Sequence, residues 1–266
     1  MKALRGIFLT LVFLVLYAPM AVMFLFSFNS IDNKFIFSGF SLRWYQQLFS
    51  DYDLMGILKN TLIVSLSAAG IATVLGVIAA YGIFRMKAGK LKSAVNTVTN
   101  IPLTNPDIIT GVSLMLLFTF VGRLFAVQGD KLGFGTLLIA HITFNLPYVI
   151  LNVLPRLVQS DRSQYEAALD LGCTPTRAFW KIIFPGIVPG IISGFIMAFT
   201  LSLDDFIISI YTRGLYDILP TSLYTMVKRP FTPEYYALYT LIFLGILFLM
   251  LAVNILQIRA EKKAKR

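Results

Sequence analysis

Charged side chains are scarce in this chain of 266 residues, and their scarcity excludes an ordinary soluble fold. Only 14% of the residues are Asp, Glu, Lys or Arg, while 57% are hydrophobic. A soluble domain carries about 25% charged residues. The chain therefore needs lipid as its solvent. Its one cysteine, Cys173, also excludes a disulfide framework within the chain.

Several motifs that build catalytic or nucleotide-binding sites are also missing. The sequence has no G-x-x-x-x-G-K-[S/T] loop to hold ATP phosphates and no G-x-S-x-G nucleophile turn. It has no His/Cys/Glu cluster with the spacing of metal ligands. We therefore expect a protein that is not an enzyme and that binds no cofactor or metal itself.

Apolar runs long enough to cross a bilayer dominate what is present. A spanning helix needs about 20 mostly apolar residues. Six stretches qualify: 7–28, 61–84, 93–121, 133–152, 186–203 and 236–258. The sequence predicts an all-α membrane protein with six transmembrane helices in a single domain, 1–266.

The net charge of +10 gives the orientation of these spans. An even number of spans puts both termini on one side, and the short loops after the second and fourth spans are rich in Lys and Arg. Short basic loops stay in the cytoplasm. We therefore expect both termini to be cytoplasmic, in a bacterial inner membrane.

The third apolar stretch is too long for one straight span. As a helix, 93–121 would reach about 43 Å, and the hydrocarbon core is about 30 Å thick. Pro102 and Pro106 each remove a backbone donor. Asn105 as N-cap, with Pro106 at the first helical position, would begin a new helix. We expect a span broken near 102–106, with Asp107 in the first turn after the break.

Acidic residues within or beside the spans are the candidate substrate-binding groups. A carboxylate inside a membrane is costly and usually functional. Asp107 either lines a pathway or caps its own half-helix, and both roles are compatible. Asp204 and Asp205, after Ser202, either attract a cation or reach the outer headgroups. Glu234, ahead of the sixth span, is a further candidate.

The sequence allows two alternative roles for each of two further residues, Trp44 and His141. Trp44, in a short segment with apolar residues at helical spacing, suits an anchor at headgroup depth or a face for a ligand. His141 is alone in the fourth span. A hydrogen-bonded packing role is favoured over proton relay because the span contains neither a second histidine nor an acid.

The loop 160–185 between the fourth and fifth spans predicts two short, capped helices. Ser163 and Glu166 have the spacing of a capping box. Gly172 is placed to end the first helix in a left-handed conformation. Thr174 then caps the second helix, with Pro175 at its first position. A capped hairpin of this kind suits docking of another protein.

The same loop resembles the EAA loop of binding-protein-dependent ABC importer permeases. The resemblance depends on one pattern: Glu166-Ala167-Ala168, three residues, Gly172, nine residues, then Ile182-x-Phe184-Pro185. Phe184 replaces the usual leucine, an apolar exchange. In that family the loop forms a coupling helix that docks on the ATPase subunit. The resemblance implies this role for Glu166, Ala167, Ala168, Gly172 and Pro185.

Over most of its length the chain looks like a PotC-type permease of spermidine/putrescine importers. The matching segments are Phe28-Asn-Ser, Trp44-Tyr45, Pro106-Asp107-Ile, His141 to Pro147, Glu166 to Pro185, Ser202 to Asp205, Ile218 to Pro220 and Tyr224 to Lys228. The resemblance implies a MetI-like fold and a second, PotB-type permease. It also implies a PotA-type ATPase dimer that uses ATP and Mg, and an extracytoplasmic PotD-type substrate-binding protein.

A polyamine fits the residues described above. Its ammonium groups need spaced carboxylates, and its methylenes pack on aromatic faces. Asp107, Asp204, Asp205 and Trp44 are of these types. Alternatives are an importer of another solute, such as an organic cation, iron(III) or sulfate, and a stand-alone secondary transporter. A secondary transporter would have no use for the hairpin.

Overall fold

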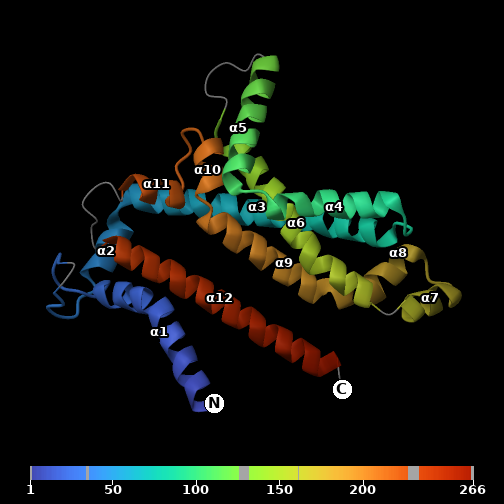
Figure 1. Ribbon diagram of the computed structural model, residues 1–266, viewed down its shortest axis with the longest axis horizontal. Coiled ribbons are helices and arrows are strands. Elements are labelled where there is room, and N and C mark those ends of the chain that lie inside the picture. Colours follow the sequence, from blue (N-terminus) through green and yellow to red (C-terminus); the bar gives the residue numbers. More distant parts are fainter. Residues whose placement is uncertain (1, 34–35, 126–131, 161, 227–233, 265–266) are drawn as a thin grey trace. The chain divides into compact units, whose positions relative to one another are not determined.

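The computed structural model describes residues 2–33, 36–125, 132–160, 162–226 and 234–264. In this part of the chain the regular secondary structure is helical, apart from one isolated bridge between Asn29 and Phe40. Two predicted segments lie partly outside the described residues: the resemblance segment Tyr224 to Lys228 at residues 227–228, and the loop 160–185 at Asp161. The helices (Figure 1) are α1 (Lys2–Phe26), α2 (Arg43–Ser50), α3 (Tyr52–Arg85), α4 (Lys90–Thr104), α5 (Asp107–Leu124), α6 (Phe134–Gln159), α7 (Arg162–Asp170), α8 (Pro175–Ala178), the π-helix η1 (Phe179–Ile183), α9 (Phe184–Asp204), α10 (Ile207–Thr212), α11 (Leu219–Met226) and α12 (Glu234–Ala264).

Among the described residues, five helical segments are long and apolar enough to cross a membrane. They are Arg5–Phe26, Tyr52–Arg85, Asp107–Leu124, Phe134–Gln159 and Pro175–Asp204. Glu234–Phe248 in α12 is a shorter apolar helix. The all-helical class predicted from composition is therefore confirmed. The fifth of these segments begins well before the predicted residue 186, because α8, η1 and α9 follow one another without a break.

The third apolar stretch is interrupted between α4 and α5. Pro106 precedes α5 with an extended ψ of 133°, and Asp107 is the first helical residue. The helix thus starts one residue later than predicted, and Asn105 is not its N-cap. Instead, the Asn105 side-chain amide donates to Thr110 Oγ1 at 2.9 Å. Pro102 lies inside α4, so Pro106 rather than Pro102 marks the interruption.

The chain forms two compact units, 1–57 with 224–266, and 58–223. In the first unit, α12 packs against α1 and α2. In the second, α6 and α9 lie side by side (Figure 1), and α10 packs on α5. The candidate acids 107, 204 and 205 and the hairpin belong to the second unit, while Trp44 and Glu234 belong to the first.

Glycine allows the close approach of α9 to α6. A Cβ atom at Gly190 would lie 2.7 Å from the Asn152 carbonyl oxygen, and one at Gly194 would lie 3.3 Å from Val149 Cα. Glycines four residues apart let membrane helices approach to backbone distance. The pair Gly190 and Gly194 is therefore the packing seam between these helices.

Gly190→Ala is expected to destabilise the protein because the added methyl group must displace backbone atoms of α6. Overpacking of this kind costs about 1–3 kcal/mol, more than the gain of about 1 kcal/mol in helix propensity. Thermal unfolding in detergent measures the effect. Gly186→Ala, on the same helix with nothing within 4 Å of its Cβ, is the matched control. Equal melting temperatures for the two variants would contradict the seam.

Candidate functional site

Asp205 is held by the start of α10. Its Oδ1 accepts a hydrogen bond from the Ile208 backbone N–H at 3.3 Å, and its Oδ2 accepts from the Ser209 N–H at 2.8 Å and the Ser209 hydroxyl at 2.7 Å. The side chain is 9% exposed. A carboxylate that accepts the first free N–H groups of a helix is a cap, and the helix dipole favours its negative charge. Asp205 therefore stabilises the bend between α9 and α10.

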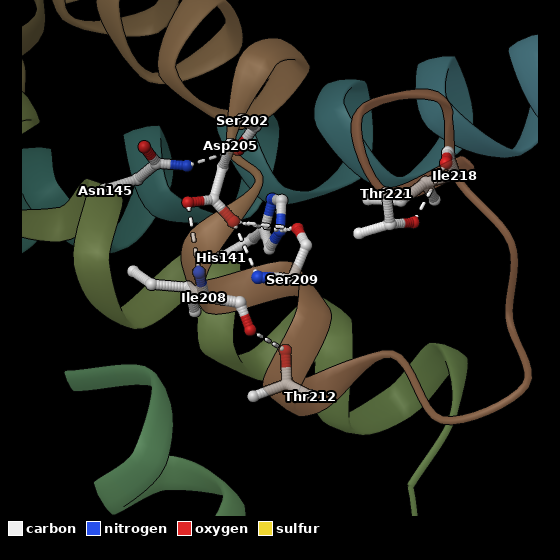
Figure 2. Close-up of polar contacts among 9 residues, drawn as sticks. All are labelled: His141, Asn145, Ser202, Asp205, Ile208, Ser209, Thr212, Ile218 and Thr221. Carbon is white, nitrogen blue, oxygen red and sulfur yellow. Dashed lines mark hydrogen bonds and ion pairs between the residues drawn. The ribbon is translucent and has the colours of Figure 1, made fainter. Parts of the chain in front are cut away.

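His141 of α6 completes the same network (Figure 2). Its Nε2 lies 2.9 Å from Ser209 Oγ and 3.6 Å from Asp205 Oδ2. Because the single hydroxyl proton of Ser209 goes to Asp205, the Ser209 oxygen must accept from His141, which places a proton on Nε2. The acid near His141, Asp205, comes from another part of the chain. The lack of an acid within the span of His141 therefore did not show that the histidine is far from every acid.

Ser202 also faces the interior. Its Oγ accepts a hydrogen bond of 2.6 Å from Asn145 Nδ2, and both side chains are buried. Asn145 follows His141 by one helical turn, so one face of α6 contacts both α9 and α10. In Figure 2 this polar cluster joins three helices. Ser202 thus serves helix packing.

Asp107 and Asp204, in contrast, are exposed on the surface of the chain. Asp107 begins α5, and its charge is close enough to Asp205 for the two to repel each other. The next turn of α5 fixes this arrangement, since a Cβ at Gly111 would lie 3.0 Å from the Tyr211 ring and 3.3 Å from the Ile207 carbonyl of α10. The second unit therefore brings Asp107 close to the bend that carries Asp204 and Asp205.

Trp44 is an interior residue of the first unit. Only 4% of it is exposed, and its indole N–H donates to the Asn29 carbonyl at 2.6 Å. Asn29 also organises the preceding loop: its side chain donates to Ile36 O at 2.8 Å and accepts from Ser38 N at 2.9 Å. The ring is therefore packed inside the first unit, and its role as an interface anchor or a face for a ligand stays a prediction.

Glu234 is half-buried at the start of α12, in the first unit. The carboxylates of Asp51 and Asp32 are near enough to repel it. The structure thus places Glu234 in an acidic group with Asp51 and Asp32 within the first unit. Its role in a substrate pathway stays a prediction.

The hairpin ends its first helix as the sequence predicts. Gly172 has φ of +82°, Cys173 N–H donates to Ala168 O, and Gly172 N–H donates to Leu169 O, both at 2.9 Å. These paired bonds define a Schellman motif. Thr174 then accepts from Arg177 N–H at 3.4 Å, with Pro175 at the first position of α8. Only the start differs: α7 begins at Arg162, so Ser163 lies inside the first turn.

Comparison with known proteins gives the family of the chain. Residues 72–266 match the family described as "Binding-protein-dependent transport system inner membrane component". The match includes the hairpin and the polar cluster. The chain belongs to this family of transport permeases.

Curated relatives of this permease match it over nearly the whole length. It is 38% identical over 263 residues to the putrescine transport system permease protein PotI of Escherichia coli K12, covering 98% of this chain and 93% of PotI. It is 35% identical over 239 residues to the spermidine/putrescine permease PotC of Haemophilus influenzae, covering 90% of each.

Among solved structures, the fold resembles that of a bacterial ABC transporter that imports the acidic polysaccharide alginate. The TM-score is 0.71, with 17% identity over 97% of this chain and 96% of that chain. A methionine transporter, MetNI, gives a TM-score of 0.58 with 17% identity over 81% of this chain and 98% of that chain. These similarities establish the MetI-like permease fold.

The hairpin of this permease is joined to the membrane helices by aromatic contacts. Phe179 packs edge-on against Tyr81 of α3, with ring centroids 4.8 Å apart, and Trp180 contacts Phe184 at 4.6 Å. These rings lie on or beside η1, the π-helical turn between α8 and α9. π-turns inside helices are frequent at functional sites. The hairpin therefore continues directly into α9.

Glu166, Ala167 and Gly172 are exposed on the hairpin, Ala168 is half-buried, and Pro185 is exposed at the start of α9. The hairpin and the bend at Asp204 and Asp205 lie at opposite ends of α9 (Figure 1). With 21 residues at 1.5 Å each, α9 separates them by about 30 Å. One helix thus connects the hairpin to the acidic cluster.

Sequence reasoning missed Asn145 and Ser209, which hold Ser202 and Asp205. Both are small polar residues inside apolar segments. A buried polar group needs a partner, so their presence was a signal that polar contacts exist. The sequence does not identify the distant partners, because Asn145 bonds Ser202 57 positions away and Ser209 bonds His141 68 positions away. The contact of Ser209 with Asp205 spans only four positions, so the spacing of a helix cap could have predicted it.

Proposed function

We propose that this chain is one of two permease subunits of an ATP-driven importer that carries a polyamine, putrescine or spermidine, into the cytoplasm. The observation that carries the proposal is the 38% identity to the putrescine permease PotI over 98% of this chain. The proposed partners are a second, PotB-type permease, a PotA-type ATPase dimer that binds ATP and Mg, and a PotD-type binding protein outside the membrane.

Asp107 and Asp204 are the substrate-facing carboxylates in this proposal. Both are exposed on the chain, whereas Asp205, Ser202 and Trp44 are occupied by contacts within it. An ammonium group leaving water needs a carboxylate to replace its hydration. We infer that the pathway lies between this chain and the second permease, which would cover the two acids.

The hairpin and α9 supply the coupling in this mechanism. The ATPase dimer would dock on α7 and α8, around Glu166, and its closure would displace the hairpin. Because α8, η1 and α9 are continuous, displacement of the hairpin is passed along α9 to Asp204 and the bend. The polar cluster of Asp205, Ser209 and His141 would then carry α10 and the adjoining α5 with it.

A reconstituted importer tests the function. The four components in proteoliposomes are expected to take up radiolabelled putrescine or spermidine only when ATP and the binding protein are both present. Sulfate and iron(III) serve as competing solutes. Preferential uptake of either one, or polyamine uptake that needs no ATP, would contradict the proposal.

A further inference from the structure

The helix that runs from α8 into α9 changes its hydrogen-bond register at η1 (Phe179–Ile183). Ala178 N–H donates to Thr174 O, four residues back, as in an α-helix, whereas Phe184 N–H donates to Phe179 O, five residues back. Such π-turns are rare and occur mostly as single turns inside α-helices. The turn that precedes α9 is therefore wider than the helical turns on either side of it.

Two prolines follow the wide turn. Pro185 lies in the first turn of α9, and Pro189 lies one turn further along. Proline has no N–H, and its ring clashes with the carbonyl four residues back. The carbonyls of Lys181 and Pro185 therefore lack their α-helical donors. Residues 179–189 thus combine two features at which helices kink, a π-turn and proline.

Beyond these prolines, α9 is locked to α6. The glycine seam begins at Gly190, where a Cβ atom would lie 2.7 Å from a carbonyl oxygen of α6. Further along, Asn145 Nδ2 donates to Ser202 Oγ at 2.6 Å. Helix α3 holds α6 in turn, because a Cβ atom at Gly76 would lie 2.5 Å from Val149 Cγ1. From residue 190 onward, α9 therefore moves as one body with α6 and α3.

Apolar contacts hold η1 against the rest of the second unit. The Phe179 ring lies edge-on to the Tyr81 ring of α3, with the ring centroids 4.8 Å apart, and Ile183 is buried. The attraction between apolar groups has no preferred direction, and packed helices slide over one another by small amounts. The turn can therefore tilt while its side chains stay packed.

We propose that residues 179–189 form a hinge, at which the hairpin of α7 and α8 changes its angle to α9 when the ATPase closes. The proposal rests on the proposed function, because that function supplies the ATPase. Bending at this place costs little, since the carbonyls of Lys181 and Pro185 have no α-helical hydrogen bonds to lose. The hinge lets the hairpin follow the ATPase while α9, α6 and α3 tilt together.

Pulsed EPR on the complete importer tests the hinge. Cys173, the only cysteine of the chain, lies on the hairpin, and Met197 is exposed on α9 beyond the start of the seam. Nitroxide labels on Cys173 and on Met197→Cys report the distance between hairpin and α9, without nucleotide and after trapping with ATP and vanadate. Residues 174–183 span about 15 Å, so a rotation of about 15° should change this distance by about 4 Å. An unchanged distance would overturn the proposal, because the hairpin and α9 would then move as one rigid helix.

A second pair of labels, across the seam, is the matched control. Leu151 of α6 and Met197 of α9 are both exposed, and both become cysteine in a Cys173→Ser background. Their distance should be the same in the two states, because the glycine seam locks α9 to α6. A change as large as that of the hairpin pair would also contradict the hinge, since the movement would then not be confined to residues 179–189.

Removal of a hinge proline gives a second test. Pro189→Ala restores the α-helical donor for the Pro185 carbonyl and should stiffen the hinge. The distance change of the hairpin pair should then be lost, and less polyamine should enter for each ATP hydrolysed. Pro155→Ala removes an exposed proline inside α6, outside the hinge, and should leave both quantities near wild type. A full distance change in Pro189→Ala would overturn the proposal.

These measurements separate the hinge from the proposed function. The two distances require the ATPase and nucleotide, and they require no polyamine. Failure of the wild type to transport a polyamine would contradict the proposed function, and the distances would still decide whether the hairpin bends at residues 179–189.

Discussion

Asp107→Asn is expected to lower the initial rate of polyamine uptake about tenfold or more without affecting assembly of the importer. The amide keeps the size of the side chain and removes the charge that an ammonium group would meet. A hydrogen bond to a charged group is worth about 1.5–3 kcal/mol, and about 1.4 kcal/mol is a factor of ten. Radiolabelled spermidine uptake into proteoliposomes, with subunit content checked on a gel, measures both effects.

Asp205→Asn is the matched control for this prediction. Asp205 accepts hydrogen bonds from Ile208 and Ser209, and one amide oxygen cannot replace both carboxylate oxygens. We expect this variant to unfold at a lower temperature, whereas Asp107→Asn should melt like the wild type. Uptake by Asp107→Asn at the wild-type rate would exclude a substrate role for Asp107. Unchanged stability of Asp205→Asn would exclude the cap.

Glu166→Lys is expected to abolish ATP-dependent uptake. Glu166 is exposed on α7, so reversing its charge leaves the fold of the permease intact and changes only the surface offered to the ATPase. Like charges placed together at an interface cost several kcal/mol. Copurification of the ATPase with the tagged permease should fall together with uptake.

Gln164→Lys is the control for the docking surface. Gln164 is exposed on the same helix and lies two residues from Glu166, toward the opposite face. It adds a positive charge away from the proposed contact, so ATPase binding and uptake should stay near wild type. If Glu166→Lys retained both normal copurification and normal uptake, α7 would not be the docking helix.

Much of the helical architecture follows from local features of the sequence. The apolar stretches predict the membrane helices because the length of a span is set by bilayer thickness. Gly172, Thr174 and Pro175 predict the turn of the hairpin because capping involves residues a few positions apart. The interruption at Pro106 follows from its missing N–H, although the helix begins one residue later than predicted.

The candidate site was harder to predict, because residue type alone does not show what a side chain contacts. Asp204 and Asp205 are neighbouring aspartates, and the sequence gives no reason to assign them different roles. The structure exposes Asp204 and binds Asp205 to Ser209. Trp44 is a residue type that is common at membrane interfaces, yet its indole N–H donates to the Asn29 carbonyl inside the first unit.

The hairpin follows from the sequence, whereas the roles of the acids follow from the tertiary structure. The sequence by itself determined an all-helical membrane protein with a capped hairpin and with acids in or beside its apolar stretches, because these features depend on composition and on short-range spacing. Only the tertiary structure decided which acids are open, Asp107 and Asp204, and which is structural, Asp205. The physical reason is that a buried carboxylate must be paired, and which of two adjacent aspartates turns inward, onto Ser209 and toward His141 of α6, depends on how α6, α9 and α10 pack.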